Sequence, residues 1–367
     1  MSTLTPTRES GASAAPEPED ETTFEQKEVA GLSQGQIVRK RFFRHKPAMV
    51  ALTVLIVVVL VATTSIGWGP IPGWWKWTYF DTPGDSLGER SSLAVLWIGG
   101  PHFFSLGNFP MGASNLGYDN FAQVMRGIQQ TLTVIVVMGL ISTFIGVVLG
   151  AAAGYYRGWV DSVLMRFTDL IITLPVVLVT AVLGVVLNAR GVFSVALVLG
   201  FLYWTQLARL VRAEFLSLRE REFVDAARVA GASDLRIIFK HILPNTVSVI
   251  VVNLTLTLSQ AILVEAALSY LGFGIQYPDV SLGSLISTYQ GAILTNEPYL
   301  FIWPGVFIIL IAMCLNFIGD GLRDAFDPRQ KRIPRMKELR RNSRTEPEVP
   351  QGPGEDQGQV VQAQGVR

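Results

Sequence analysis

The stretch AMVALTVLIVVVLVATTSIG, residues 48–67, decides the fold class, because it is a long apolar run without a single charged side chain. An α-helix needs about 20 mainly apolar residues to cross the hydrocarbon core of a bilayer. Five more runs have the same character, and they cover residues 128–154, 163–187, 192–210, 246–271 and 299–318. The sequence therefore predicts an all-α polytopic membrane protein with six transmembrane helices.

The composition agrees with a chain that is partly surrounded by lipid. Of its 367 residues, 50% are hydrophobic and only 16% are charged, with a mean hydropathy of +0.38. Soluble domains carry about 25% charged residues, so the deficit excludes an ordinary soluble enzyme. The net charge of +1 gives no electrostatic case for nucleic acid as a partner. The single cysteine, Cys314, excludes an internal disulfide and a cysteine-rich metal site.

The distribution of charge predicts the orientation in the membrane. Basic residues accumulate in the short cytoplasmic segments of membrane proteins. Here they cluster before the first run, between the second and third runs, in the link 211–245 and after the sixth run. The alternate links, including residues 68–127, are poor in them. Both termini are therefore expected in the cytoplasm, with residues 68–127 as an extracytoplasmic loop of a multi-pass protein in the cell (plasma or inner) membrane.

The two ends of the chain lack any apolar period. Residues 1–36 are expected to form a disordered, somewhat acidic leader and residues 331–367 a disordered tail. Residues 37–330 remain as a six-span domain. Tryptophans gather in its extracytoplasmic loop, as a membrane-interface belt or as a docking surface for an extracytoplasmic partner. They are Trp68, Trp74, Trp75, Trp77 and Trp97.

The cytoplasmic link reads RLVRAEFLSLREREFVDAARVAGASDLRIIFKHILPN over residues 209–245. Helix formers fill residues 212–230, Gly231 is suited to end that helix, and Ser233 or Asp234 is suited to cap the next one. Two short helices with a glycine joint are therefore expected on the inner membrane face. Small residues in the first helix would allow the close approach of another protein, and a solvated loop with a positive-inside bias is the simpler interpretation.

At Asp225-Ala226-Ala227, Gly231 and Leu243-Pro244, the link resembles the cytoplasmic "EAA" signature of permease subunits of ABC importers. In that family the loop forms a coupling helix that docks on a cytoplasmic ATPase. The signature has Glu where this chain has Asp225, which keeps the carboxylate. It has a branched apolar residue where this chain has His241, and the stretch around His241 is typical of the peptide branch. The resemblance implies a coupling segment, residues 222–244, whose site residues are Glu222, Asp225, Ala226, Ala227, Gly231, Ala232, His241, Leu243 and Pro244.

Further blocks extend the resemblance over about residues 37–329. Over this range the chain resembles the dipeptide, oligopeptide and nickel permeases, and among them the second permease subunit, the DppC/OppC type. These blocks are residues 41–46, 155–161, 165–175, 265–274 and 319–329. Residues 112–119, before the second span, depart from the family's pattern. The resemblance implies the MetI-like ABC importer permease fold.

The resemblance also implies a function. The chain would form half of the translocation path of an ATP-driven importer that works by alternating access. The implied cargo is short peptides, with a nickel chelate or another small solute as the alternative. The implied partners are a second homologous permease subunit, cytoplasmic ABC ATPases that bind ATP and Mg²⁺, an extracytoplasmic solute-binding protein and membrane lipid.

Polar side chains inside the apolar runs are candidates for the path or its gate, because they are costly in lipid. They are Asn253, Gln260, Glu265 and Asn316. Hydrogen bonds between helices account for the amides equally well. For Glu265, a buried ion pair with a neighbouring subunit is the alternative.

Other residues in the spans predict structural features. Asp169 is expected to pair with Arg166 or to reach water. Pro175 is expected to kink the third span. Small residues in the second span offer positions for close helix packing, and they are Gly139, Gly146, Gly150 and Gly154.

Motifs for catalysis or nucleotide binding do not stand out. The chain contains no G-x-x-x-x-G-K-[ST] and no H-E-x-x-H. Its histidines, His45, His102 and His241, are too dispersed for a metal site. We therefore expect no catalytic residue, no metal and no cofactor on this chain, and ATP hydrolysis on partner subunits. An intramembrane enzyme would need paired groups at one depth, and a receptor would need a further signalling domain.

Overall fold

The computed structural model describes four stretches of the chain, residues 34–83, 109–186, 191–294 and 297–327. The predicted tail, and the predicted leader apart from residues 34–36, lie outside the described residues, as do Trp97 and His102. The chain divides into two units, Met1–Phe326 and Asp327–Arg367. The fold that follows is that of the first unit.

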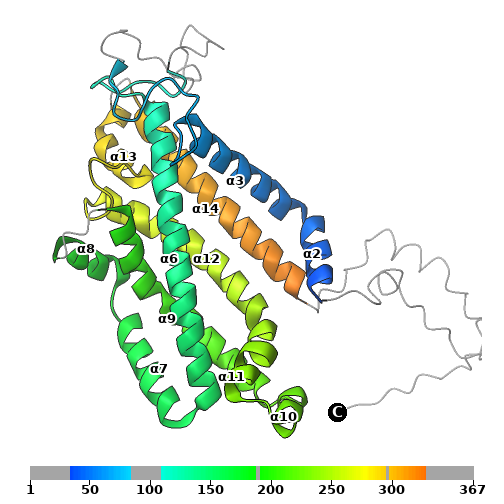
Figure 1. Cartoon of the computed structure of the whole chain (residues 1–367). Helices are drawn as coiled ribbons and strands as arrows, with labels where there is room; N and C mark the ends of the chain where they lie inside the picture. Colours follow the sequence, from blue (N-terminus) through cyan, green and yellow to red (C-terminus); the bar gives the residue numbers. More distant parts are fainter. Residues whose placement is uncertain (1–33, 84–108, 187–190, 295–296, 328–367) are drawn as a thin grey trace, which may run out of the picture. The chain divides into compact units, whose positions relative to one another are not determined.

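Within the described residues the chain is helical, with two isolated β-bridges and no extended strand. This architecture confirms the predicted fold class. The helices, labelled as in Figure 1, are α2 (Gln34–Arg44), α3 (Lys46–Ser65), α6 (Asn120–Tyr156), α7 (Gly158–Ile172), α8 (Val176–Val186), α9 (Val192–Leu218), α10 (Glu222–Val229), α11 (Asp234–Arg236), η1 (Ile237–Ile242), α12 (Leu243–Tyr270), α13 (Leu282–Thr288), η2 (Gln290–Leu294) and α14 (Tyr299–Phe326).

Five of these helices are long and apolar enough to cross a membrane: α3, α6, α9, α14, and the continuous helix formed by α11, η1 and α12. The third predicted run, residues 163–187, corresponds to α7 and α8, which pass the same test only as a pair and are bent by 84°. The bend lies before Pro175, because proline has no N–H for a helix and disfavours helical backbone in the residue before it. The predicted kink is confirmed, and it breaks the third run into two helices.

Several helices extend beyond the apolar runs that predict them. α6 begins at Asn120 rather than near residue 128, and the carboxylate of Asp119 caps it by accepting a hydrogen bond from Phe121 N at 3.1 Å. α9 continues to Leu218 and α14 to Phe326. Apolar runs mark only the lipid-crossing part of a helix, so polar turns at the ends escape them.

The central helix pair is α6 and α9, which lie side by side (Figure 1) and make the most extensive contact in the unit. Glycines of α6 make this contact possible. A Cβ on Gly150 would lie 2.5 Å from Ala208 O, and one on Gly154 would lie 2.6 Å from Phe215 Cβ. Only glycine lets the two backbones approach so closely. The predicted packing role of these small residues is confirmed.

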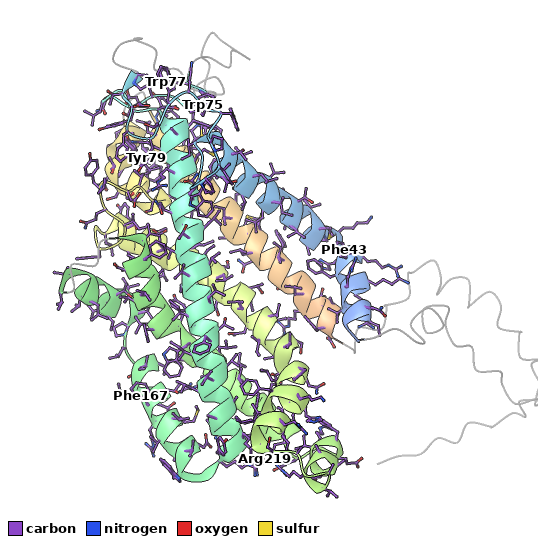
Figure 2. The ribbon with its side chains drawn as sticks, in the orientation of Figure 1. Phe43, Trp75, Trp77, Tyr79, Phe167 and Arg219 are labelled. Atoms are coloured by element: carbon purple, nitrogen blue, oxygen red, sulfur yellow. The ribbon has the colours of Figure 1, made fainter. Side chains whose placement is uncertain are left out.

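The unit has two ends that matter for function (Figure 1). One carries α10 and α11 and is called the α10 end; the other carries α13 and is called the α13 end. α6 runs from one to the other as an uninterrupted helix of 37 residues. Figure 2 shows Arg219 at the α10 end, with Trp75 and Tyr79 at the α13 end.

Candidate functional site: the coupling segment

The coupling segment consists of α10, a glycine turn, α11 and the start of the next long helix. The helix predicted over residues 212–230 is not continuous, because the chain breaks at residues 219–221 between α9 and α10. Helix propensity is overridden there, since the guanidinium of Arg219 donates to Tyr155 O at the end of α6 and lies 5.3 Å from the Tyr155 ring. The break lets α10 turn away from α9.

The glycine joint has the geometry that the sequence predicts. Gly231 has φ +79°, a left-handed conformation that costs a side-chain-bearing residue about 1–2 kcal/mol. Its N–H donates to Arg228 O at 2.9 Å, and Ala232 N donates to Ala227 O at 3.0 Å. These two bonds satisfy carbonyls at the end of α10. Ser233 precedes α11 as its N-cap residue, as one of the two predicted alternatives has it.

The signature residues lie mostly on the surface. Asp225, Ala226 and Gly231 are exposed, as are Glu222 and Pro244. Ala227, Ala232, His241 and Leu243 are half-buried. Asp225 is paired with Arg228 one turn on, at 3.1 Å. The structure thus brings the predicted residues into one continuous segment with a small-residue face open to a partner.

Large apolar side chains of the same segment are also exposed, and sequence reasoning did not single them out. Val229 is 91% exposed, Leu235 63% and Phe239 62%. Exposed apolar groups gathered at one site commonly mark an interaction surface. In the 8-residue helix α10, Val224 is buried and Val229 is exposed. A second valine on the face opposite the buried one was the signal in the sequence that could have identified this surface.

A short polar contact fastens the segment to the spans. The Tyr155 hydroxyl, at the end of α6, donates to Asp234 Oδ1 at 2.6 Å. Asp234 is the first residue of α11, where a carboxylate also favours the helix N-terminus. Beneath this contact lies a buried apolar cluster that includes Phe215, Val224 and Ile237. The coupling segment is therefore packed against both α6 and α9.

Ion pairs tie neighbouring helices to the same end. Asp161 of α7 accepts from both Nε and Nη2 of Arg212, the latter at 2.6 Å. Asp169 pairs with Arg209 of α9 and its side chain stays exposed, so the predicted pair with Arg166 was wrong, while the alternative, that Asp169 reaches water, stays a prediction. The Arg157 guanidinium beside Glu220 holds the pKa of that exposed carboxyl below its usual value. These pairs join α6, α7 and α9 around the coupling segment.

A turn of π-helix, Ile237–Ile242, connects α11 to α12. Pro244 lies in the first turn of α12 and cannot donate a backbone hydrogen bond. Leu243 N reaches Ile238 O, five residues back, in the wider turn. Asn245 Nδ2 donates to His241 O at 2.7 Å. The Leu-Pro end of the signature therefore marks a local widening of the helix rather than a free loop.

The candidate path residues are not all brought together. Asn253 and Gln260 lie on α12 and Asn316 on α14, and these two helices pack against each other. Gln260 and Asn316 are exposed on this chain, and Asn253 is half-buried. Glu265 is separate from them because it is fully buried.

The α13 end holds a cavity and the described tryptophans of the predicted extracytoplasmic loop. Trp75 is half-buried, and its Nε1 donates to Asp119 Oδ2 at 2.5 Å. This contact is structural, while Trp74 stays 63% exposed. Nearby, a cavity of about 200 Å³ has five aromatic residues among the thirteen that line it, including Tyr79 and Tyr289. No group of three or more His, Cys, Asp or Glu side chains suited to a metal occurs within the described part of the chain.

The chain is similar to two protein families and to several known permeases. The family "Binding-protein-dependent transport system inner membrane component" matches residues 146–332, and "N-terminal TM domain of oligopeptide transport permease C" matches residues 33–82. The oligopeptide transport system permease protein OppC of Mycobacterium tuberculosis H37Rv is 36% identical over 304 residues, which is 83% of this chain and 97% of that protein.

Two other relatives and one solved structure are also similar. OppC of Haemophilus influenzae is 34% identical over 84% of this chain and 93% of its own length. A putative peptide permease of Brucella ovis is 36% identical over 81% of this chain and 92% of its own length. An inward-facing structure of the MetNI methionine ABC transporter aligns with a TM-score of 0.47 at 19% identity, over 56% of this chain and 96% of that one.

Proposed function

This chain belongs to the family of binding-protein-dependent transport system inner membrane components, and from that premise we propose that it is the permease subunit of an ATP-driven importer of short peptides. A multi-pass membrane location and a transport role follow from the family and from the apolar helices. The peptide cargo is proposed because relatives that match most of the chain are named as oligopeptide or peptide permeases.

One observation carries the proposed mechanism. The exposed residues Asp225 and Ala226 lie on a segment that Tyr155 and a buried apolar cluster fasten to α6 and α9. A cytoplasmic ATPase docked on that face would therefore push on two membrane-spanning helices at once. Rigid movement of these helices switches the cavity between inward-facing and outward-facing states. ATP and Mg²⁺ would bind to the ATPase subunits, and this chain would transmit the movement of those subunits to its membrane-spanning helices.

The orientation follows from the same assignment. The α10 end would lie in the cytoplasm and the α13 end outside, with both termini cytoplasmic. Basic residues support this direction, because the α10 end holds Arg212, Arg219, Arg228, Arg236 and Lys240. An extracytoplasmic solute-binding protein would then deliver cargo to the α13 end.

The path would be completed by a second, homologous permease subunit. Asn253, Gln260 and Asn316 leave polar surface on α12 and α14 that lipid would not tolerate well. We infer that these amides line the path between the two subunits. Glu265 would belong to the gate rather than to the wetted path, because its side chain is enclosed by protein.

Transport by the purified assembly tests this function. The chain is tagged, purified from membranes with whatever subunits accompany it, and placed in proteoliposomes with ATP inside and the solute-binding protein outside. We expect ATPases to co-purify and a labelled tripeptide to accumulate with ATP hydrolysis, while ⁶³Ni²⁺ does not. Accumulation of nickel without tripeptide, or the absence of any ATPase, would overturn the proposal.

A further inference from the structure

Glu265 is the one candidate gate residue whose surroundings are fully defined. Its side chain has no exposed surface. Ser269 Oγ donates to Oε1 at 2.7 Å, and Thr131 Oγ1 donates to Oε2 at 3.2 Å. The Ser281 hydroxyl is a third hydrogen-bond donor to the same carboxyl. None of the ion pairs among the described residues includes Glu265.

The hydroxyl groups are oriented toward the carboxyl by backbone hydrogen bonds. Ser269 Oγ accepts from Ile275 N at 3.2 Å, and Ser281 Oγ accepts from Ser284 N at 3.2 Å. Each hydroxyl proton is therefore free to point at Glu265. A buried carboxyl without such donors would be strongly unfavourable. Three donors from separate elements make Glu265 the common acceptor of α6, α12 and the N-terminus of α13.

Close backbone contacts surround the carboxyl. A Cβ on Gly127 of α6 would lie 3.0 Å from Leu282 N, and one on Gly283 of α13 would lie 2.6 Å from Ala266 Cα. A Cβ on Gly274 would lie 2.7 Å from Ser269 Cα. Glycine at these positions lets α13 sit directly against α6 and α12.

A second polar link holds the turn that precedes α13. Arg126 Nη2 and Gln130 Nε2, both on α6, donate to Asp279 Oδ1 at 2.7 and 2.8 Å. Asp279 lies two residues before Ser281. The same turn is therefore bound to α6 through Asp279 and to the Glu265 carboxyl through Ser281. α6, the end of α12 and α13 form one clamped body.

The other end of α6 carries the Tyr155 contact to the coupling segment. One uninterrupted helix, about 55 Å long at 1.5 Å per residue, thus joins the two places. On the basis of the proposed function, we propose that Glu265 is a positioning residue that locks α13 to α6 and α12, so that movement of the coupling segment is delivered to the α13 end.

Cross-linking tests the clamp without relying on transport. Gln123 Oε1 of α6 accepts from the Tyr289 hydroxyl, just after α13, at 3.0 Å. In the assembled complex, Gln123→Cys and Tyr289→Cys are introduced in a Cys314→Ala background and treated in membranes with a short bis-maleimide. We expect efficient cross-linking when Glu265 is intact. The yield should fall severalfold in Glu265→Ala and by less in Glu265→Gln, because glutamine keeps one acceptor oxygen. Equal yields in all three would overturn the clamp, whatever the cargo.

Transport then tests whether the clamp transmits movement. Thr131→Val removes one hydroxyl donor with little change in volume, and Thr133→Val is its control, because Thr133 Oγ1 bonds only within α6, to Gln129 O at 2.8 Å. We expect Thr131→Val to keep expression and ATP hydrolysis but to lower uptake severalfold, because the hydrogen bond between α6 and the Glu265 carboxyl is lost. The control should stay near the parent, and equal losses in the two variants would contradict the proposal.

A double-mutant cycle separates transmission from mere stability. Tyr155→Phe loosens the opposite end of α6. Because both substitutions break the same linkage, the double variant with Thr131→Val should take up no less peptide than the single variant with the lower uptake. Losses that multiply would show two independent structural defects and would overturn the inference. Failure of the parent complex to import peptide, with the cross-link still dependent on Glu265, would instead reject the proposed function and retain the clamp.

Discussion

The Tyr155 hydroxyl donates to Asp234 Oδ1 at 2.6 Å, and this contact joins the last turn of a 37-residue span helix to the first residue of α11. The two residues are 79 positions apart in the chain. Through this contact and the buried cluster beneath it, an exposed surface segment is held on the helices that form the interior of the unit. The function proposed for the chain depends on that attachment.

Removing the Tyr155 hydroxyl should loosen the coupling segment. Tyr155→Phe deletes the donor to Asp234 and keeps the ring that Arg219 covers. We expect amide hydrogen exchange in α11 and η1 to accelerate about tenfold, as for loss of one hydrogen bond to a charged group. Mass spectrometry of the purified complex measures this rate. Tyr156→Phe, at an exposed neighbouring ring, is the control. Unchanged exchange in Tyr155→Phe would show that the contact does not stabilise the coupling segment.

Gly231→Asp should leave the protein inserted in the membrane and uncouple uptake from ATP hydrolysis. The aspartate meets an unfavourable φ of +79° and adds charge to the small-residue face. A Cβ at Gly231 meets no atom within 4 Å, so the effect would come from conformation and charge rather than from a clash. Gly305→Ala, also in open space but with ordinary φ, is the control. Normal peptide uptake in vesicles that carry Gly231→Asp would refute this prediction.

Val229→Glu should weaken the association with the ATPase. Val229 is 91% exposed beside the signature residues, and a charge there would have to be buried on docking. We expect at least about tenfold less ATPase to co-purify, since burying an unpaired charge at an interface costs several kcal/mol. Leu294→Glu provides a matched control, because Leu294 is also 91% exposed and lies in η2. Comparable ATPase recovery with the two variants would argue against this surface.

The stability of the α13 end should depend on pH through Asp119. Burial raises the pKa of this carboxyl to about 6, although hydrogen bonds from Trp75 and Phe121 and the charge of Lys76 oppose the shift. The folded state therefore holds a proton between about pH 4 and 6 that the unfolded state has lost. Stability contributed by this group falls as pH rises through that window and is constant above it.

Thermal unfolding of the purified protein at pH 5 and pH 7 measures this effect. The Asp119 contribution should raise the thermal midpoint at pH 5 above that at pH 7, and it adds at most about 1.4 kcal/mol between these two pH values, because only the pH unit from 5 to 6 lies in the window. Asp119→Asn removes the titrating group and should abolish that part of the pH dependence. An Asp119→Asn variant with the same pH dependence as the parent would contradict the assignment.

Hydropathy predicted most of the fold, because each helix that crosses a bilayer needs a minimum length and an apolar composition, and both are visible in the sequence. Pro175 likewise revealed the break between α7 and α8, and the glycines of α6 revealed a packed face. The start of α6 was missed, because Gln123 and Arg126 interrupt the apolar run although they lie in the helix. Those polar residues are satisfied by tertiary partners, which a hydropathy profile does not contain.

The signature predicted where the coupling segment lies but not how it is attached. Asp169 pairs with Arg209 instead of the local Arg166, since helix packing brings the distant cation closer. The break at residues 219–221 occurs in a stretch of good helix formers because Arg219 is held by Tyr155. Both outcomes depend on contacts between residues far apart in the chain, and propensity reports only local preference.

The most direct test of the account is the number of peptides imported per ATP hydrolysed, measured in proteoliposomes for the parent complex, Tyr155→Phe and Tyr156→Phe. We predict that Tyr155→Phe hydrolyses ATP at a rate close to that of the parent and imports about tenfold fewer peptides per ATP, while Tyr156→Phe matches the parent. A Tyr155→Phe complex with the parental ratio would show that the coupling segment does not act through α6, and the account would be wrong.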